Sequence, residues 1–251
     1  MRIALISDIH ANLPALEAVL AAIAAERVDL TLCLGDLVGY NADPHECLAL
    51  LQTQVQYIVA GNHDYDIARE SSAPGTVKAA HIAQTWTRQT LNAAELAYLD
   101  GLPNKHIENG TYIAVHGCYL NDWHVTGYVT STMLEKNLAA IAQRETWPKL
   151  AFCGHTHVPL AGYLDGEETV ESNPIKQPIF TWPKNARAVL LNPGSVGQPR
   201  DNSTSAAFAL LDLTARRAEF RRAPYDLERT IASIHRAGLP GELAERLREG
   251  R

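Results

Sequence analysis

Short apolar runs alternate with helical patterns over the first 60 residues of the chain. These runs are typical of strands that are buried on both faces of a sheet. They comprise residues 2–7, 30–34 and 55–60. Between them, Asn12 is placed to cap one helix, and Asp43-Pro44 opens a second helix predicted to run through Leu51. The alternation predicts a parallel sheet with right-handed crossovers.

The pattern changes after residue 60. Polar and chain-breaking residues fill 61–75, and no regular element is predicted within the polar, proline-containing segment 165–186. Asn109-Gly110 is a strong hairpin signal between two short strands. The predicted strands are 105–109, 111–116, 149–153, 158–164, 188–192, 206–212 and 216–222. The predicted helices lie around 77–90, 93–100, 131–143, 226–236 and 240–249.

Length and composition are consistent with a single domain over residues 1–251. A chain of 251 residues with 46% hydrophobic residues can bury one large core. The order of the elements predicts the α/β class, with two mixed sheets packed together and helices outside them.

Charge and cysteine content exclude some classes of protein. The chain has 22 Lys and Arg against 28 Asp and Glu, a net charge of −6, which disfavours general nucleic-acid binding. The four cysteines form no C-x-x-C pair and predict reduced thiols in a cytoplasmic protein. The start of the chain, MRIALISDIH, lacks the pattern of a signal peptide, and no stretch approaches the ~20 apolar residues of a membrane span. We therefore expect no membrane partner.

Five polar segments follow predicted strands directly, at the ends where ligands bind in α/β sheets. They are Asp8-Ile9-His10, Gly35-Asp36, Gly61-Asn62-His63-Asp64, His116-Gly117 and Gly154-His155-Thr156-His157. Taken alone, each is an ordinary turn or a satisfied polar pair. Together they supply carboxylate, amide and imidazole groups, which suit Mn, Fe, Co, Ni or Zn better than Ca or Mg. The five segments therefore predict a metal centre.

Local geometry adds three expectations about this centre. Asp8 and His10 point the same way if strand geometry persists beyond residue 7. A turn at 154–157 could direct His155 and His157 to different ions. The Asp36 carboxylate has two oxygens and can bridge two ions, while the neighbouring glycines let the backbone turn sharply.

The five segments, in this order, resemble the pattern D-x-H, G-D, G-N-H-[DE], H and G-H-x-H of the calcineurin-like metallophosphoesterase superfamily. The stretches SDIHANLPALEAVL, GDLVGYNADPHEC, NPGSVGQPRD and AGLPGELAERLREG resemble its small prokaryotic phosphodiesterases, including the diadenosine tetraphosphate hydrolase-like subgroup. The resemblance implies a four-layer α/β/β/α sandwich. It also implies two divalent ions, with Mn²⁺ expected first and Fe, Zn, Ni and Co as alternatives.

The resemblance also implies roles for individual residues. One ion would be held by Asp8, His10 and His157, and the other by Asn62, His116 and His155. Asp36 would bridge the two ions. His63 is similar to the active-site histidine of the family, with Asp64 as its expected hydrogen-bond partner; a helix cap is the structural alternative for Asp64.

These roles predict a two-metal phosphohydrolase, in which a metal-activated hydroxide attacks phosphorus in line and His63 protonates the leaving oxygen. The expected substrate is a small, nucleotide-like phosphodiester or dinucleoside polyphosphate. Three alternatives remain open: a phosphomonoesterase such as a protein phosphatase, a nuclease, and a non-catalytic binding module of the same fold.

Several residues near the motifs are weaker candidates. Tyr40, Asn41 and Arg200 are candidates for substrate contact, and the glycines of the loop 192–201 could present backbone N–H groups to a phosphate. A structural loop is the alternative. Cys118-Tyr119 stands where relatives commonly have Ser-Pro, and the segment around His124 could also line the pocket. Cys118 and Cys153 are expected to be buried packing residues.

Overall fold

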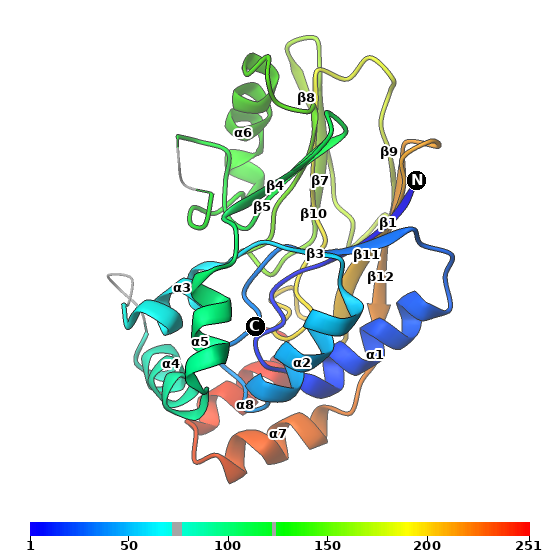
Figure 1. Cartoon of the computed structure of the whole chain (residues 1–251). Helices are drawn as coiled ribbons and strands as arrows, with labels where there is room; N and C mark the ends of the chain where they lie inside the picture. Colours follow the sequence, from blue (N-terminus) through cyan, green and yellow to red (C-terminus); the bar gives the residue numbers. More distant parts are fainter. Residues whose placement is uncertain (72–76, 122–123) are drawn as a thin grey trace.

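The structure is a computed structural model of the chain and describes residues 1–71, 77–121 and 124–251. These residues form two six-stranded sheets packed face to face, with helices on the outer faces (Figure 1). The first sheet has the order β3 (Tyr57–Ile58), β2 (Leu30–Cys33), β1 (Arg2–Ile6), β11 (Ala206–Asp212), β12 (Arg217–Ala223) and β9 (Ile179–Thr181). The second has the order β4 (Lys105–Glu108), β5 (Tyr112–Val115), β6 (Leu150–Phe152), β10 (Ala188–Asn192), β7 (Leu160–Asp165) and β8 (Glu168–Ser172).

Both sheets are mixed, as the sequence predicted. In the first sheet β1, β2 and β3 are parallel, and β1 is antiparallel to β11 on its other side. In the second sheet β5, β6 and β10 are parallel. The predicted fold class, with two mixed sheets between outer helices, is therefore confirmed.

Strand β1 shows why these short runs are so apolar. Ile3 and Leu5 face the other sheet, whereas Ala4 and Ile6 face the helices. Because successive side chains point to opposite faces, a strand between two layers needs apolar residues at every position. On the far side of the inter-sheet core, Tyr112 and Phe152 supply the bulk. This buried strand fixes the position of the residues that follow it.

The helices complete the outer layers. They are α1 (Leu13–Ala24), α2 (Pro44–Gln54), α3 (Asn62–Arg69), α4 (Lys78–Thr90), α5 (Ala93–Asp100), α6 (Ser131–Gln143), α7 (Leu227–Arg236) and α8 (Gly241–Glu249). The α1 helix packs on the first sheet, and Asn12 caps it as predicted, because its side chain accepts the N–H of Ala15 at 3.3 Å. On the second sheet, α6 packs through Leu134, Leu138 and Ile141. Within the described residues, no helix has the length and apolar character that a membrane span requires.

Four elements differ clearly from the prediction. Helix α3 begins at Asn62, inside a stretch predicted to be irregular, since Asp64 accepts the N–H of Gly61 and so closes its first turn. Strands β8 and β9 lie within 165–186, where half-exposed edge strands carry few apolar residues. Strand β3 is shorter than the predicted 55–60. In each case tertiary contacts, rather than local pattern, decide the element.

Candidate metal centre

The carboxyl ends of five strands, three in the first sheet and two in the second, bring the polar segments together. Asp8 and His10 follow β1, and Asp36 follows β2. His116 follows β5, while His155 and His157 follow β6. Asn62 and His63 lie in the first turn of α3, directly after β3. Because the two sheets face each other, residues from both meet at one buried place.

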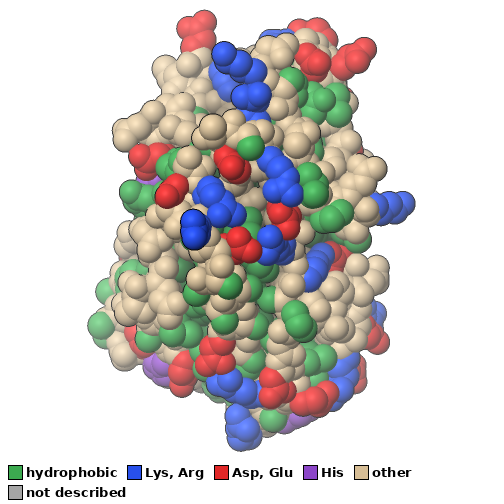
Figure 2. Space-filling view, turned by 90° about the vertical axis from the view of Figure 1, so that its right-hand side faces the viewer, with side chains coloured by type: hydrophobic (Ala, Val, Ile, Leu, Met, Phe, Trp, Pro, Cys, Tyr) green, Lys and Arg blue, Asp and Glu red, His purple; other side chains and the backbone are tan. Residues whose placement is uncertain are grey.

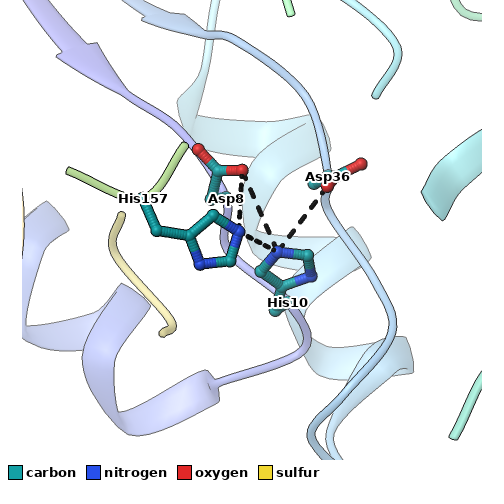
Figure 3. Close-up of side chains that lie close together, drawn as sticks. All are labelled: Asp8, His10, Asp36 and His157. Carbon is teal, nitrogen blue, oxygen red and sulfur yellow. Dashed lines mark hydrogen bonds and ion pairs between the residues drawn. The ribbon is translucent and has the colours of Figure 1, made fainter. Parts of the chain in front are cut away.

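A first group of side chains consists of Asp8, His10, Asp36 and His157, whose donor atoms all lie within 4.8 Å of one another (Figure 3). The Nε2 atom of His157 lies 3.3 Å from Oδ1 of Asp8 and 3.1 Å from Nε2 of His10. His10 Nε2 also lies 3.6 Å from Oδ2 of Asp36. All four side chains are buried.

A second group shares Asp36 with the first and adds His116 and His155. The Nε2 atom of His116 lies 3.3 Å from Oδ2 of Asp36 and 3.1 Å from Nδ1 of His155. Asn62 lies close to the shared carboxylate, since the N–H of the next residue, His63, donates to Oδ1 of Asp36 at 2.9 Å. The Oδ1 atom of Asn62 is buried without a hydrogen-bond partner among the described residues.

The hydrogen bonds of the imidazoles fit a cation at each group. The Nδ1 atoms of His10, His116 and His157 face the backbone carbonyls of Val38, Leu34 and Gln198, at 3.2, 2.7 and 2.6 Å. A carbonyl can only accept, so each Nδ1 carries a proton, and in a neutral ring the Nε2 atom turns a lone pair inward. At His116, whose pKa the Asp36 carboxylate raises, a bound cation would take the place of the second proton on Nε2. The Nε2 atoms of His10 and His157 lie 3.1 Å apart, with two such lone pairs between them. Ligand atoms on one ion, with bonds of roughly 2.0–2.2 Å, lie about 3 Å apart.

The electrostatics of the cluster also favour positive charge. Burial raises the pKa of Asp8, but the neighbouring His157 outweighs it and holds that pKa below its usual value. Burial lowers the pKa of His116, yet the Asp36 carboxylate overcomes this and raises it to about 9. Burial, followed by the charge of His116, lowers the pKa of His155 to about 3. Two carboxylates among mostly neutral imidazoles leave a negative site that a divalent cation would balance.

The backbone at the candidate ligands is strained. Left-handed φ angles occur at Asp8 (55°), His10 (48°), Asp36 (55°), His155 (68°) and His157 (61°). Residues other than glycine rarely adopt this backbone region, and each instance costs roughly 1–3 kcal/mol. Strand geometry does not persist beyond Ile6, so the condition for Asp8 and His10 to share a strand face is not met, and the two residues converge through a turn. Such strain is held in place by the surrounding structure and is concentrated at functional sites.

Two glycines allow the segments to approach so closely. Gly35 has a φ of 94°, which turns the chain directly before Asp36. At Gly61, a Cβ atom would lie 2.0 Å from Oδ1 of Asp36. Any other residue at position 61 would therefore displace the shared carboxylate.

Asp64 does not make the contact expected of it. Its Oδ2 accepts the N–H groups of Asp36 at 3.0 Å and Gly61 at 2.8 Å, and its Oδ1 accepts that of Leu37 at 2.8 Å. Both oxygens are thus engaged with backbone, and the expectation that Asp64 orients the His63 ring is corrected. The contact agrees better with the alternative of a helix cap, since Asp64 is the third residue of α3 and accepts the N–H of its N-cap residue, Gly61.

His63 is buried beside the first group. Its ring centroid lies 4.9 Å from that of His10 and 4.7 Å from that of Tyr40. The Nε2 atom of Gln84, on α4, lies 3.5 Å from Nδ1 of His63. Burial, partly opposed by the charge of Asp36, lowers the pKa of His63. No motif marked Gln84, because only the packing of α4 brings it to the site.

The weaker candidates divide into two sets. Arg200 donates from Nη2 to the hydroxyl of Tyr40 at 3.3 Å, and the Tyr40 ring centroid lies 4.6 Å from that of His10. Both residues therefore border the centre. Asn41 is buried and donates from Nδ2 to the carbonyl of His10 at 2.8 Å, which holds the turn in place.

The loop 192–201 supports the centre from behind. The N–H of Gly197 donates to the carbonyl of Asp8 at 2.9 Å, and that of Gly194 donates to Oδ1 of Asn192 at 2.9 Å. Both glycine N–H groups are therefore occupied, so the expectation that they cradle a phosphate is corrected in favour of a structural loop. The carbonyl of Gln198, in the same loop, fixes the ring of His157.

Other polar residues lie outside the two groups. Cys118 and Cys153 are buried thiols, and burial raises the pKa of both, as expected of packing residues. His124 is buried, with its ring centroid 5.8 Å from that of Trp147 and its Nδ1 3.4 Å from the carbonyl of Cys118. Asp122 and Trp123, in the segment considered for the pocket, lie outside the described residues.

Sequence reasoning also missed Tyr128. Its ring stacks on that of His155, with centroids 4.1 Å apart and an interplanar angle of 15°. Tyr128 follows a stretch of polar residues with no recognisable motif, so only the folded chain reveals this contact.

Two facing mixed sheets, with a buried cluster of imidazole, carboxylate and amide groups at their strand ends, define a metallophosphoesterase. Residues 1–216 match the sequence model of the calcineurin-like phosphoesterase superfamily domain, and the chain belongs to this superfamily. It is accordingly a hydrolase of phosphoesters, from a family that depends on divalent metals.

Individual relatives extend the likeness to the whole chain. The uncharacterized protein MJ0912 of Methanocaldococcus jannaschii is 34% identical over 99% of this chain and 98% of its own. The crystal structure of a metallophosphoesterase from Sphaerobacter thermophilus is 36% identical, with a TM-score of 0.83 over 100% of this chain and 99% of that one. A putative diadenosine tetraphosphatase, at 15% identity and a TM-score of 0.53 over 89% of this chain and 94% of that one, shares the fold.

Proposed function

We propose that the protein hydrolyses phosphodiester or phosphoanhydride bonds of small nucleotide-like substrates at a dinuclear metal centre. The observation that carries this proposal is the sharing of Asp36 between two groups of donor atoms. A single carboxylate in both groups is the arrangement that two closely spaced ions require. The whole of residues 1–251 would act as one catalytic domain, since β1 and β11 pair and the carbonyl of Gly250 accepts the N–H of Asn202.

The donor sets suggest how the ions divide. Asp8, His10 and His157 would hold one ion, and Asn62, His116 and His155 the other, with Asp36 on both. Mixed nitrogen and oxygen donors suit Mn²⁺, while Fe, Zn, Ni and Co compete for the same ligands. When bound, two such cations activate a water molecule near neutral pH and balance the charge of the phosphate oxygens.

The residues around the cluster would bind and protonate the substrate. We assign His63 the transfer of a proton to the leaving oxygen, because its ring is buried beside the first group without being part of it. Arg200 would bind a phosphate oxygen that is not transferred, with Tyr40 keeping the guanidinium in place. Asn41 and Asp64 would act as positioning residues, since both hold backbone next to candidate ligands.

Surface charge and thiols are consistent with a small substrate and a cytoplasmic enzyme. On the face shown in Figure 2, Lys and Arg side chains are interspersed with Asp and Glu, which differs from the basic surface of a nuclease. All four cysteines are free and buried, a state that a reducing compartment preserves.

The experiment is an assay of purified protein loaded with Mn²⁺, Zn²⁺, Fe²⁺, Co²⁺ or Ni²⁺ in turn. We expect p-nitrophenol release from bis-p-nitrophenyl phosphate to exceed release from p-nitrophenyl phosphate. The His63→Ala variant should lose about 10²–10⁴-fold in kcat while retaining both ions. No turnover with any metal would favour a binding module, a preference for the monoester would favour a phosphomonoesterase, and loss of metal in His63→Ala would make His63 a ligand.

A further inference from the structure

A cavity of about 320 Å³ opens beside the second donor group, between the start of α6 and the end of β8. We call it the Tyr128 pocket. Its walls include Tyr128, Val158, Leu160, Glu171, Ser172 and Ile175. The volume falls within the range of small-molecule sites, about 300–1,000 Å³. The mechanism proposed above makes no use of this cavity.

The pocket lies next to the candidate ligands, although none of them forms part of its described lining. Tyr128 stacks on His155 with ring centroids 4.1 Å apart, so one aromatic ring separates the cavity from the cluster. Thr156 also lines the cavity, and it lies in the chain between His155 and His157. A group attached to a phosphate held at the cluster would therefore enter the pocket by passing the Tyr128 ring.

The chemistry of the walls selects the kind of group. Tyr128 and Ile175 are each 51% exposed, so both present accessible apolar surface in the wall of the cavity. Val158 and Leu160 extend the apolar wall. Apolar and aromatic walls of this kind accept a flat ring by stacking and apolar contact.

Glu171 adds a polar edge to the pocket. One of its carboxylate oxygens, Oε2, accepts the hydroxyl of Ser131 at 2.7 Å, which leaves Oε1 to accept N–H groups. Among the described residues that line the cavity, the charged group is this carboxylate, and no Lys or Arg is present. The pocket is therefore unsuited to a second phosphate and suited to a ring that carries N–H donors.

We propose that the Tyr128 pocket binds the base of a nucleotide, with its ring against Tyr128 and Ile175 and an N–H donor of the base toward Glu171. The inference rests on the proposed function for the position of the phosphate. It adds that the pocket distinguishes nucleotides from other phosphoesters.

Binding can be tested apart from catalysis by titration calorimetry of the Mn²⁺-loaded His63→Ala protein with AMP and with ribose 5-phosphate. The two probes carry the same phosphate and differ in the base. We expect AMP to bind about tenfold more tightly. Added to that background, Ile175→Ala and the cavity-filling Ser172→Phe should remove the difference, with ribose 5-phosphate unchanged.

The chain offers two matched controls. Ile179 is 52% exposed and lies outside the pocket, so Ile179→Ala should leave the preference for AMP intact. Tyr57 is 38% exposed and stacks on His106 with ring centroids 4.2 Å apart, as Tyr128 stacks on His155. Neither Tyr57 nor His106 lines the pocket or belongs to a donor group. Tyr57→Ala should have no effect, whereas Tyr128→Ala should abolish the preference.

A kinetic comparison separates the two proposals. Thymidine 5′-(p-nitrophenyl phosphate) and methyl p-nitrophenyl phosphate have the same leaving group and the same reaction. We expect wild-type kcat/KM to favour the thymidine ester by about tenfold and Ile175→Ala to lose that preference. Hydrolysis of both esters at equal rates, together with equal binding of AMP and ribose 5-phosphate, would overturn the base pocket and leave the hydrolase intact. Hydrolysis of neither ester would contradict the proposed function, and the calorimetric comparison would then decide the pocket.

Discussion

The carboxylate of Asp64 holds the backbone of Asp36 from beneath. It accepts the N–H of Asp36 at 3.0 Å, and with its other oxygen it accepts the N–H of the next residue, Leu37, at 2.8 Å. The backbone of Asp36 at this point has a left-handed φ of 55°. Asp64 therefore stabilises the conformation that turns the shared carboxylate toward both donor groups.

This contact makes Asp64→Ala a test of positioning against catalysis. The variant leaves buried N–H groups without an acceptor, and each such group costs about 1–3 kcal/mol. We expect the free energy of unfolding, measured by urea denaturation, to fall by about 2 kcal/mol or more, and the affinity for Mn²⁺ to fall about 10–100-fold. At saturating Mn²⁺, kcat should largely recover.

The matched control is Asp66→Ala on the same helix, whose carboxylate accepts the hydroxyl of the partly exposed Ser71. It should leave metal affinity unchanged. If Asp64→Ala instead kept its ions and lost kcat, Asp64 would act on His63 after all.

Asp36 and Asn62 should differ in how many ions they control. Asp36 belongs to both donor groups, so Asp36→Asn should weaken both ions together. The Oδ1 atom of Asn62 is buried without a hydrogen-bond partner in the described part of the chain, and we assign it to the second ion alone, so Asn62→Ala should release one ion and retain the other. Elemental analysis of the dialysed proteins measures this directly. One ion per chain in Asp36→Asn would show that the carboxylate is not shared.

Gly61→Ala should damage the centre by steric conflict alone. The added Cβ would lie 2.0 Å from Oδ1 of Asp36, so the carboxylate must move. We expect metal affinity to fall by about 10–100-fold, as for other changes beneath a ligand. Gly241→Ala is the control, because nothing lies within 4 Å of its Cβ; at the first position of α8 it should stabilise the fold by about 0.4–1 kcal/mol. Normal metal binding by Gly61→Ala would mean that Asp36 can retreat without cost.

Acid should destabilise the metal-free protein. Burial is the main cause that lowers the pKa of His155 to about 3 and that of His10 well below the ordinary 6.5. Below pH 6.5 the unfolded chain therefore binds protons that the folded chain does not, and stability falls as the pH falls. Each histidine contributes up to about 1.4 kcal/mol per pH unit.

The pKa shift of Asp64 changes the pH dependence of stability in the opposite direction, by a similar amount per pH unit. Burial, with the charge of Asp36, raises its pKa to about 7, so its contribution to stability is lost as the pH rises from about 4 to 7. Two histidines outweigh one carboxyl group, and we expect net loss of stability from pH 6.5 to pH 5 in urea titrations with EDTA. His155→Gln should flatten the slope. A free energy of unfolding that stays constant or increases as the pH falls from 6.5 to 5 would contradict neutral, buried imidazoles.

Local pattern was sufficient for elements whose own residues decide their structure. Helix α6 has the predicted bounds, 131–143, because its apolar residues recur at helical spacing. Strands β4 and β5 flank Asn109-Gly110, as the turn signal indicated. Convergence of the polar segments was predictable as well, since parallel strands end at a common edge.

Distant contacts decide what the sequence could not show. The acceptors of the Asp36 and Leu37 amides lie on α3, a short helix whose residues are mostly polar. The N–H of Gly197 bonds to the carbonyl of Asp8, and no motif in either segment names the other as its partner. Tyr128 and Gln84 reach the site through packing of entire elements.

The pairing of β1 with β11 has a consequence for how the protein is made. Ile3 lies opposite Leu211, and Gln198, just before β11, fixes the ring of His157. While the ribosome is still adding the middle of the chain, the segment Asp8-Ile9-His10 lacks strand β11 beside β1. It also lacks the loop 192–201, whose Gly197 N–H donates to the carbonyl of Asp8. Such long-range pairing is slow to form. Metallation therefore belongs to the end of synthesis, when most of the polypeptide has emerged.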